Sequence, residues 1–253
     1  MPWEATPPAN LIEDKFRLEI GLWQTGVDTV IRADATPEQP GTTLDAESDV
    51  GLTDTKLMPE LELTLLPAKH HLVRLNTFSS HRSGQAVLTE DVQFDGNDYF
   101  TGELVKSTLN LDMVGLGYGY RLFNTPRYEL DLGVDVQIAS VESNVYVPRR
   151  FVREADAGVL PIPLLDVDGR WNVWRNWQLL GRYRWLGGSG NDGDVKGSLR
   201  DWRFGVQWQF SQHIGVGLLY RHFGVAVDSG STSHPGSLRL DYSGAELAFR
   251  ASL

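Results

Sequence analysis

From Lys15 to its C-terminus, the sequence repeats segments of about ten residues in which apolar and polar side chains alternate, each followed by a turn. Residues 128–138 show the pattern most clearly, with Tyr128, Leu130 and Leu132 alternating with Glu129 and Asp131. Because a strand directs successive side chains to opposite faces, each segment predicts a strand with one apolar and one polar face. Around a closed sheet, this alternation is typical of a transmembrane β-barrel with a polar lumen.

The composition agrees with a barrel and argues against other classes. The chain has 253 residues, of which 22% are charged, and a mean hydropathy of -0.26. It has no run near the roughly 18 apolar residues that a spanning helix needs. The net charge of -10 argues against a nucleic-acid partner, and the absence of cysteine suits export through an oxidising compartment. The first ten residues lack the features of a secretory signal, so this interpretation takes the sequence as the mature form.

The turns predict the topology. We count ten candidate strands, joined by four short connections, after the second, fourth, sixth and eighth strands, and by five longer polar ones that include residues 33–54 and 142–156. Outer-membrane barrels have short periplasmic turns and longer external loops. We therefore predict an all-β fold: a ten-stranded antiparallel up-and-down transmembrane β-barrel with both termini periplasmic. Residues 1–14 form a periplasmic N-terminal arm and residues 15–253 one barrel domain. The alternative is a soluble β-sandwich.

The same pattern predicts which side chains of the first and fourth strands point outward. The apolar positions of the first strand change parity near Gly21 to Trp23, which predicts a bulge there. In the fourth strand, Leu109, Leu111 and Met113 are predicted to face outward, with a change of parity before Leu116.

Strand parity also predicts a charged lumen. Its predicted members are Glu19, Glu62, Arg74, Asp112, Asp131, Asp135, Asp166, Asp168, Arg170, Arg182, Arg184, Arg203 and Arg221. Long charged side chains from ten strands cross much of a small barrel. They form either an ion-pair network that fills and stiffens the barrel or the lining of a narrow pore for small polar solutes or ions.

Aromatic residues gather near the four short turns. Trp and Tyr prefer the boundary of a bilayer, where the ring is apolar and its edge polar. The predicted periplasmic girdle consists of Tyr118, Tyr120, Tyr128, Trp171, Trp174, Trp177, Trp208 and Phe210. The alternative is that these rings belong to the core of a sandwich.

An enzymatic interpretation needs acids and a histidine that converge at the outer rim. Omptin-type outer-membrane proteases are also ten-stranded and use paired acids with an Asp-His pair, and lipid A-modifying hydrolases act in the same membrane. The rim candidates here are His81, His222, Asp91, Asp228 and the acids Glu90 and Glu142. The spacing of these residues reproduces neither the paired acids nor the Asp-His pair of such a protease. We therefore expect no catalytic residues, and a surface-facing outer-membrane enzyme stays the alternative.

Metal and cofactor motifs are also absent from the sequence. The acids of residues 45–54 lack the spacing of an EF-hand and are expected to be solvated. The glycines of residues 115–119 alternate on a strand and open no helix, so they predict no phosphate site. We expect no metal and no cofactor.

The chain resembles a widespread group of uncharacterised outer-membrane β-barrel proteins of Gram-negative bacteria. The resemblance covers nearly the whole sequence and rests on Gly41–Asp45, Asp49–Leu52, His71–Leu75, Arg82–Gly84, Gly197–Asp201, Leu240–Gly244 and Phe249–Leu253. It implies a barrel in the cell outer membrane and carries over no activity. One departure is the terminal Leu253, where such barrels usually end in an aromatic residue.

The expected function is therefore an integral outer-membrane barrel with a largely filled lumen, structural or porin-like. The expected partners are outer-membrane lipid, lipopolysaccharide and, during biogenesis, the assembly machinery of the membrane. Arg149, Arg150 and Arg153 are candidates for contacts with lipopolysaccharide phosphates, or are solvated loop charges. No sequence feature defines an oligomer, and a monomer is favoured.

Overall fold

A computed structural model describes residues 15–36, 38–94, 96–147, 152–174, 176–189, 195–211, 213–230 and 235–253, with the backbone alone at 152–160, 188, 189 and 195. The N-terminal arm, Arg149 and Arg150, and the side chain of Arg153 lie outside the described parts. Among the described residues no helix is long and apolar enough to span a membrane.

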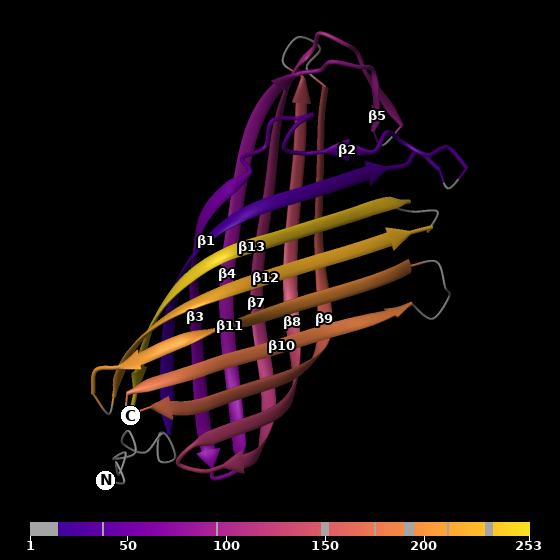
Figure 1. Cartoon of the computed structure of the whole chain (residues 1–253). Helices are drawn as coiled ribbons and strands as arrows, with labels where there is room; N and C mark the ends of the chain where they lie inside the picture. The colour runs from indigo at the N-terminus through magenta and orange to yellow at the C-terminus, as the bar shows by residue number, and fades with distance from the viewer. Residues whose placement is uncertain are drawn as a thin grey trace.

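Ten long strands form one closed antiparallel sheet, and this confirms the predicted fold class (Figure 1). The strands are β1 (Phe16–Ala33), β3 (Thr55–Ala68), β4 (His71–Val87), β7 (Leu104–Asn124), β8 (Tyr128–Val147), β9 (Val152–Trp174), β10 (Trp177–Ser189), β11 (Val195–Gln209), β12 (Ile214–Ser229) and β13 (Gly236–Ser252). Each strand pairs with the next along the chain, and β13 pairs with β1 over Arg17 to Ala33 to close the barrel. Toward the turn connections every strand has a partner on both sides, whereas the register of β9 with β10 ends at Leu165 and that of β4 with β3 ends at Phe78.

The two ends of the barrel differ. One end, the turn end, holds Lys15, Leu253 and the short connections β3–β4, β7–β8, β9–β10 and β11–β12. The Lys15 N–H donates to the Leu253 carbonyl at 2.8 Å. At the opposite end, the capped end, the long β1–β3 connection carries β2 (Leu44–Asp45), and the β4–β7 connection carries the hairpin of β5 (Val92–Phe94) and β6 (Asn97–Tyr99). Figure 1 shows β2 and β5 at the capped end, beside the taller wall of β4, β7, β8 and β9.

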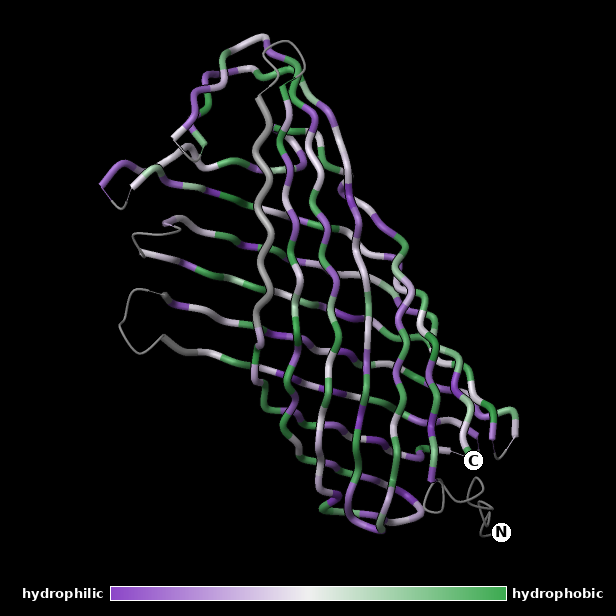
Figure 2. The backbone as a smooth tube through the Cα atoms, turned by 180° about the vertical axis from the view of Figure 1, so that it is seen from behind, coloured by the Kyte–Doolittle hydropathy of each residue, from purple (hydrophilic) through white to green (hydrophobic). Residues whose placement is uncertain are grey.

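The outer wall carries a continuous apolar band. On β8 the outward residues are apolar from Tyr128 to Ile138, and the polar Glu142 lies beyond them. Figure 2 shows apolar and polar residues alternating along the strands. Ten residues at about 3.4 Å each, tilted by about 40°, give a height of roughly 25 Å, which matches the apolar band of outer-membrane barrels.

The predicted bulge of the first strand is wrong. The register of β1 with both β13 and β3 is continuous through Gly21, Leu22 and Trp23. Trp23 and Val27 point into the barrel and are buried. The apparent change of parity arises because the lumen itself becomes apolar toward the capped end.

The predicted facing of Leu109, Leu111 and Met113 is wrong for the same reason. All three are buried inside the barrel, and the parity of β7 stays constant until Arg121, beyond which the register with β8 shifts. The predicted loop over residues 142–156 is also wrong, because β8 and β9 pair without interruption to Val147 and Val152. The two strands therefore extend well beyond the apolar band.

Candidate functional site

The lumen next to the turn end is occupied by a charge cluster around Glu129 of β8. Arg17 of β1 makes two hydrogen bonds to the Glu129 carboxylate, at 2.7 and 2.9 Å. Arg121 of β7 bonds both Glu129 and Asp131, with its Nε 2.8 Å from Asp131 Oδ1. Arg170 of β9 approaches Glu129 at 4.0 Å. One carboxylate thus ties together four strands.

The middle of the lumen is held by Arg182 of β10. Its guanidinium pairs with Glu62 of β3, on the opposite side of the barrel, and with Asp168 of β9 at 2.8 Å. Arg74 of β4 joins the same cluster through Asp166 and Glu62. Two facing walls are therefore tied together directly by ion pairs.

A third cluster lies closer to the capped end. Arg221 of β12 donates two 3.0 Å hydrogen bonds to Asp201 of β11 and also pairs with Glu60 of β3. Arg184 of β10 pairs with Asp201 as well. Arg203 joins this cluster to the middle one through Glu246 at 3.5 Å and Glu62 at 3.5 Å.

The buried charges nearly balance. Among the described residues, ten arginines and eleven carboxylates are buried, and no lysine is. Arginine suits this role because its planar group presents five donors that several carboxylates can share. The network therefore fills the lumen with paired charges. The cavity between Glu19 and Arg203 has a volume of about 10 Å³, enough for one water molecule at most.

Three inward glycines of β7 make room for side chains of the two neighbouring strands, β8 and β4. A Cβ at Gly115 would lie 2.2 Å from the amide of Gln137, and one at Gly117 would lie 1.8 Å from Asp135. A Cβ at Gly119 would approach Leu72 at 2.8 Å. Their alternation reflects the packing of the lumen.

An apolar layer lies between the charge network and the capped end. Its centre is four rings from four strands: Trp23, Phe78, Phe223 and Tyr242, with ring centroids 5.4 to 6.4 Å apart. The remaining buried members are Val27, Met58, Leu111, Met113, Ala139, Ile162, Leu164, Leu199 and Leu240. Arg221 packs beneath the layer, 4.7 Å from the Trp23 ring and 5.3 Å from the Phe78 ring. The layer spans the lumen from wall to wall.

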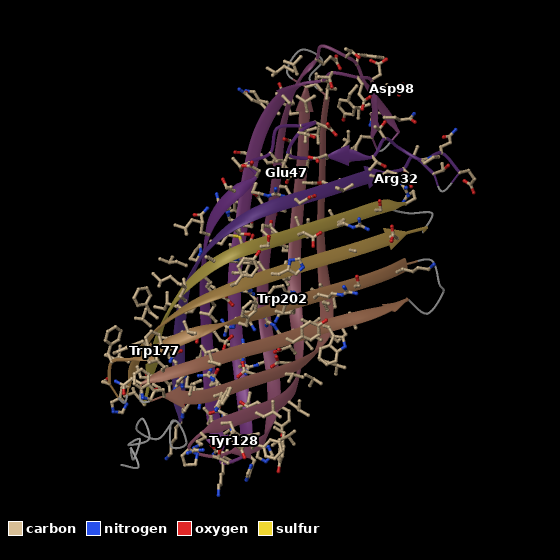
Figure 3. The ribbon with its side chains drawn as sticks, viewed as in Figure 1. Arg32, Glu47, Asp98, Tyr128, Trp177 and Trp202 are labelled. Carbon is tan, nitrogen blue, oxygen red and sulfur yellow. The ribbon has the colours of Figure 1, made fainter. Side chains whose placement is uncertain are left out.

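Residues 34–54 fold over this layer as a cap. Leu44, Ala46, Val50 and Leu52 are buried against side chains of the β4–β7 connection and of β7 and β8. Glu47 anchors the cap, because it accepts the Thr29 N–H at 2.8 Å and pairs with buried Arg82. Figure 3 shows Glu47 at the capped end, far from Tyr128 and Trp177.

The β4–β7 connection completes the cap. The Thr42 N–H donates to the Gln93 carbonyl at 2.7 Å, and the Gln93 N–H donates to Thr42 Oγ1 at 2.9 Å. Thr101 donates its N–H and its hydroxyl to Asp91 at 2.8 and 2.9 Å. These bonds lower the pKa of the Asp91 carboxyl below its ordinary value. Asp91 therefore serves as an acceptor within a loop.

The structure places twelve of the thirteen predicted lumen residues inside the barrel with buried side chains. The exception is Asp112, whose predicted position is wrong: its side chain is 50% exposed on the outer wall, 3.1 Å from His81 Nε2. The error follows from the reversed facing of β7. Arg239 and Asp241 of β13 also lie on the outer face of the wall.

Some members of the network were not predicted from the sequence. Glu60 has the parity of Glu62, and Asp201 has that of Arg203. Glu246 directly precedes the outward Leu247, so the signal for all three was present in the alternation. Arg121 has the parity opposite to the outward Tyr118 and Tyr120, so the same signal was present for this residue. Arg250, at 3% exposure, was missed although it follows Phe249 in the same alternation.

The rim candidates do not come together. His81 lies on the outer wall of β4 beside Asp112, and His222 lies on that of β12, 3.7 Å from Asp241. Asp91 belongs to the cap and Asp228 to the end of β12. Within the described residues, no three His, Asp or Glu side chains come together as a metal site requires.

The eight predicted girdle residues all have exposed side chains on the outer wall near the turn end. Trp177 and Trp208 face each other across β10 and β11 with ring centroids 4.7 Å apart. A second aromatic group, not foreseen, lies higher on the wall, where Trp202 contacts Phe204, Tyr220 and His222. The two groups are separated by apolar Val206 and Leu218.

Comparison with known proteins gives a fold and no family. No protein-family model and no curated protein matches the chain. Among solved structures, the outer-membrane protease OmpT from Escherichia coli superposes with a TM-score of 0.60 at 9% identity, over 98% of this chain and 100% of that chain. The toluene transporter TodX from P. putida (TM-score 0.39, 8% identity, 95% and 90% covered) and the NalP translocator from Neisseria meningitidis (0.44, 8%, 93% and 88%) are more distant. The chain thus has the fold of an outer-membrane β-barrel.

Proposed function

We propose that the protein is an integral barrel of the bacterial outer membrane, with the turn end in the periplasm and the capped end outside. The continuous apolar band of the outer wall, flanked by aromatic rings, supports a position in a bilayer. The likeness in fold to OmpT agrees with it.

We further propose that this barrel is closed and acts as a membrane-anchored scaffold for its capped surface. The observation that carries this proposal is that three successive layers of side chains fill the lumen. They are the charge network, the apolar layer around Trp23 and Phe223, and the cap anchored by Glu47. A conducting path needs a continuous polar lining, and the apolar layer interrupts it. The narrow-pore alternative would need this layer to part.

Planar-bilayer recording tests the closed state. Protein that is folded, as shown by its heat-dependent migration on a gel, is expected to leave the bilayer silent. An open porin gives the positive signal. Reproducible single-channel steps from the folded protein would contradict the proposal and favour the pore.

The surface-enzyme alternative has less support. Its His-acid pairs, His81–Asp112 and His222–Asp241, lie on the outside of different strand pairs rather than converging above the lumen. We propose a non-enzymatic role on this ground. Hydrolysis of peptides or lipid A by the folded protein, lost in His81→Ala or His222→Ala, would overturn it.

A further inference from the structure

A groove of about 470 Å³ opens on the outer wall close to the turn end. It runs across β8, β9 and β10 and is bordered by the large side chains of Phe123, Tyr128, Trp171 and Leu179. Its floor consists of Gly169 and Gly181. Figure 3 shows Tyr128 at the lower end of the barrel.

The groove exists because two outward positions on neighbouring strands lack side chains. Gly169 of β9 and Gly181 of β10 are direct partners in the register. A Cβ at Gly181 would meet no atom within 4 Å, and one at Gly169 would meet its nearest atom at 3.9 Å. Neither glycine is therefore required by close packing or by backbone conformation.

The charges beside the groove select its occupant. Arg127 is exposed in the turn that leads into Tyr128. In the described parts of the short connections, the charged side chains, Lys69 and Arg127, are both basic. A second copy of the chain docking through the same face would place an Arg127 from each copy in one interface, because a two-fold interface uses the same patch on both partners. An apolar chain that ends in an anion fits both the groove and this charge.

We propose that the groove binds one acyl chain of an anionic glycerophospholipid, whose phosphate pairs with Arg127. The inference rests on the proposed position in the membrane, since the lipid belongs to the leaflet that meets the turn end. The rings of Tyr128 and Trp171 border the chain where it leaves the groove, as aromatic residues do at a bilayer boundary.

Native mass spectrometry of the detergent-solubilised full chain, titrated with phosphatidylglycerol or phosphatidylcholine, tests the proposal. Wild type is expected to retain one phosphatidylglycerol in preference to phosphatidylcholine. Gly181→Leu fills the groove without a clash and is expected to lose this retention. Gly187→Leu is the matched control, because Gly187 lies on the same strand with nothing within 4 Å of its Cβ, and should retain the lipid.

The headgroup is tested by Arg127→Gln, with Lys69→Gln as the control in another short turn. One basic side chain near a membrane surface contributes about 1 kcal/mol, so the preference for phosphatidylglycerol is expected to fall about fivefold in Arg127→Gln alone. Equal retention by wild type and Gly181→Leu, or a dimer that Gly181→Leu abolishes, would overturn the acyl-chain site. An unchanged preference in Arg127→Gln would overturn the phosphate contact.

Failure of this inference is distinguishable from failure of the proposed function. Each variant is first checked for heat-dependent migration and for insertion into vesicles. A barrel that inserts, stays silent in a planar bilayer and binds no lipid at this groove would contradict only the lipid site. A chain that does not insert would contradict the membrane location itself.

Discussion

Gly117 of β7 lies directly opposite Asp135 of β8, and a Cβ at position 117 would lie 1.8 Å from Asp135 Oδ1. The carboxylate occupies the space that any other residue would need. Asp135 approaches Arg184 at 4.0 Å, so moving it would disturb the ion-pair network. The small residue is therefore a requirement of the filled lumen.

Gly117→Ala is expected to destabilise the folded barrel by about 1–3 kcal/mol, the usual cost of overpacking a dense interior. Gly181→Ala is the matched control, since its Cβ meets nothing within 4 Å. Denaturant unfolding in lipid vesicles gives both free energies. Equal stability of the two variants would mean that the lumen around Asp135 is looser than described.

Glu129→Gln is expected to destabilise the barrel by about 3–5 kcal/mol, because it leaves the buried Arg17 and Arg121 without their shared charged partner. Glu142→Gln, on the exposed face of the same strand, should change the stability by less than about 0.5 kcal/mol. The same unfolding measurement applies. A small effect of Glu129→Gln would show that water compensates these arginines.

Val134→Arg is expected to reduce the stability of the barrel in lipid by about 2–4 kcal/mol, because Val134 lies in the middle of the apolar band. Asn144→Arg, on the same face of β8 beyond the band, should be tolerated. Unfolding in vesicles and yield of inserted protein measure the effect. If both variants insert equally well, this band does not face lipid.

Glu47→Gln is expected to loosen the cap, because it weakens a buried pair with Arg82 that contributes about 1.5–3 kcal/mol. Limited proteolysis within residues 34–54 should become about tenfold faster or more. Glu38→Gln, exposed in the same connection, is the control. Because the apolar layer remains in place, the variant should stay silent in planar bilayers, and channel steps would mean that the cap alone closes the lumen.

Alternation and turns were sufficient to predict the ten strands and their order, because both the strand period and the position of turns depend on local sequence. They could not predict which face is inside when both faces are apolar. Leu111 and Leu116 lie on opposite faces of β7, and nothing local distinguishes them. The inward face is the one that packs against Trp23, Phe78 and Phe223 of other strands. The sequence of β7 alone carries no information about these contacts.

The site shows the same division. Charged residues on clearly amphipathic strands, such as Asp131 and Arg182, were placed by parity alone. Asp112 was misplaced because its strand has apolar residues on both faces. The cap was missed for another reason: residues 34–54 have no period, and Leu44 and Leu52 are buried only because β7 and β8 extend beyond the band to cover them.

The cross-lumen ion pairs have a consequence for how the barrel forms. Arg17 and Glu129 are 112 residues apart, and Arg221 and Glu60 are 161 apart. Before the first and last strands pair, the sheet is open, and these charged side chains would be separated from one another by water. The charged side chains reach their partners only when the sheet closes. The pairing of β1 with β13 and the exclusion of water from the lumen are therefore one cooperative event. A chain of this kind is poorly suited to pausing as a stable half-barrel in the bilayer.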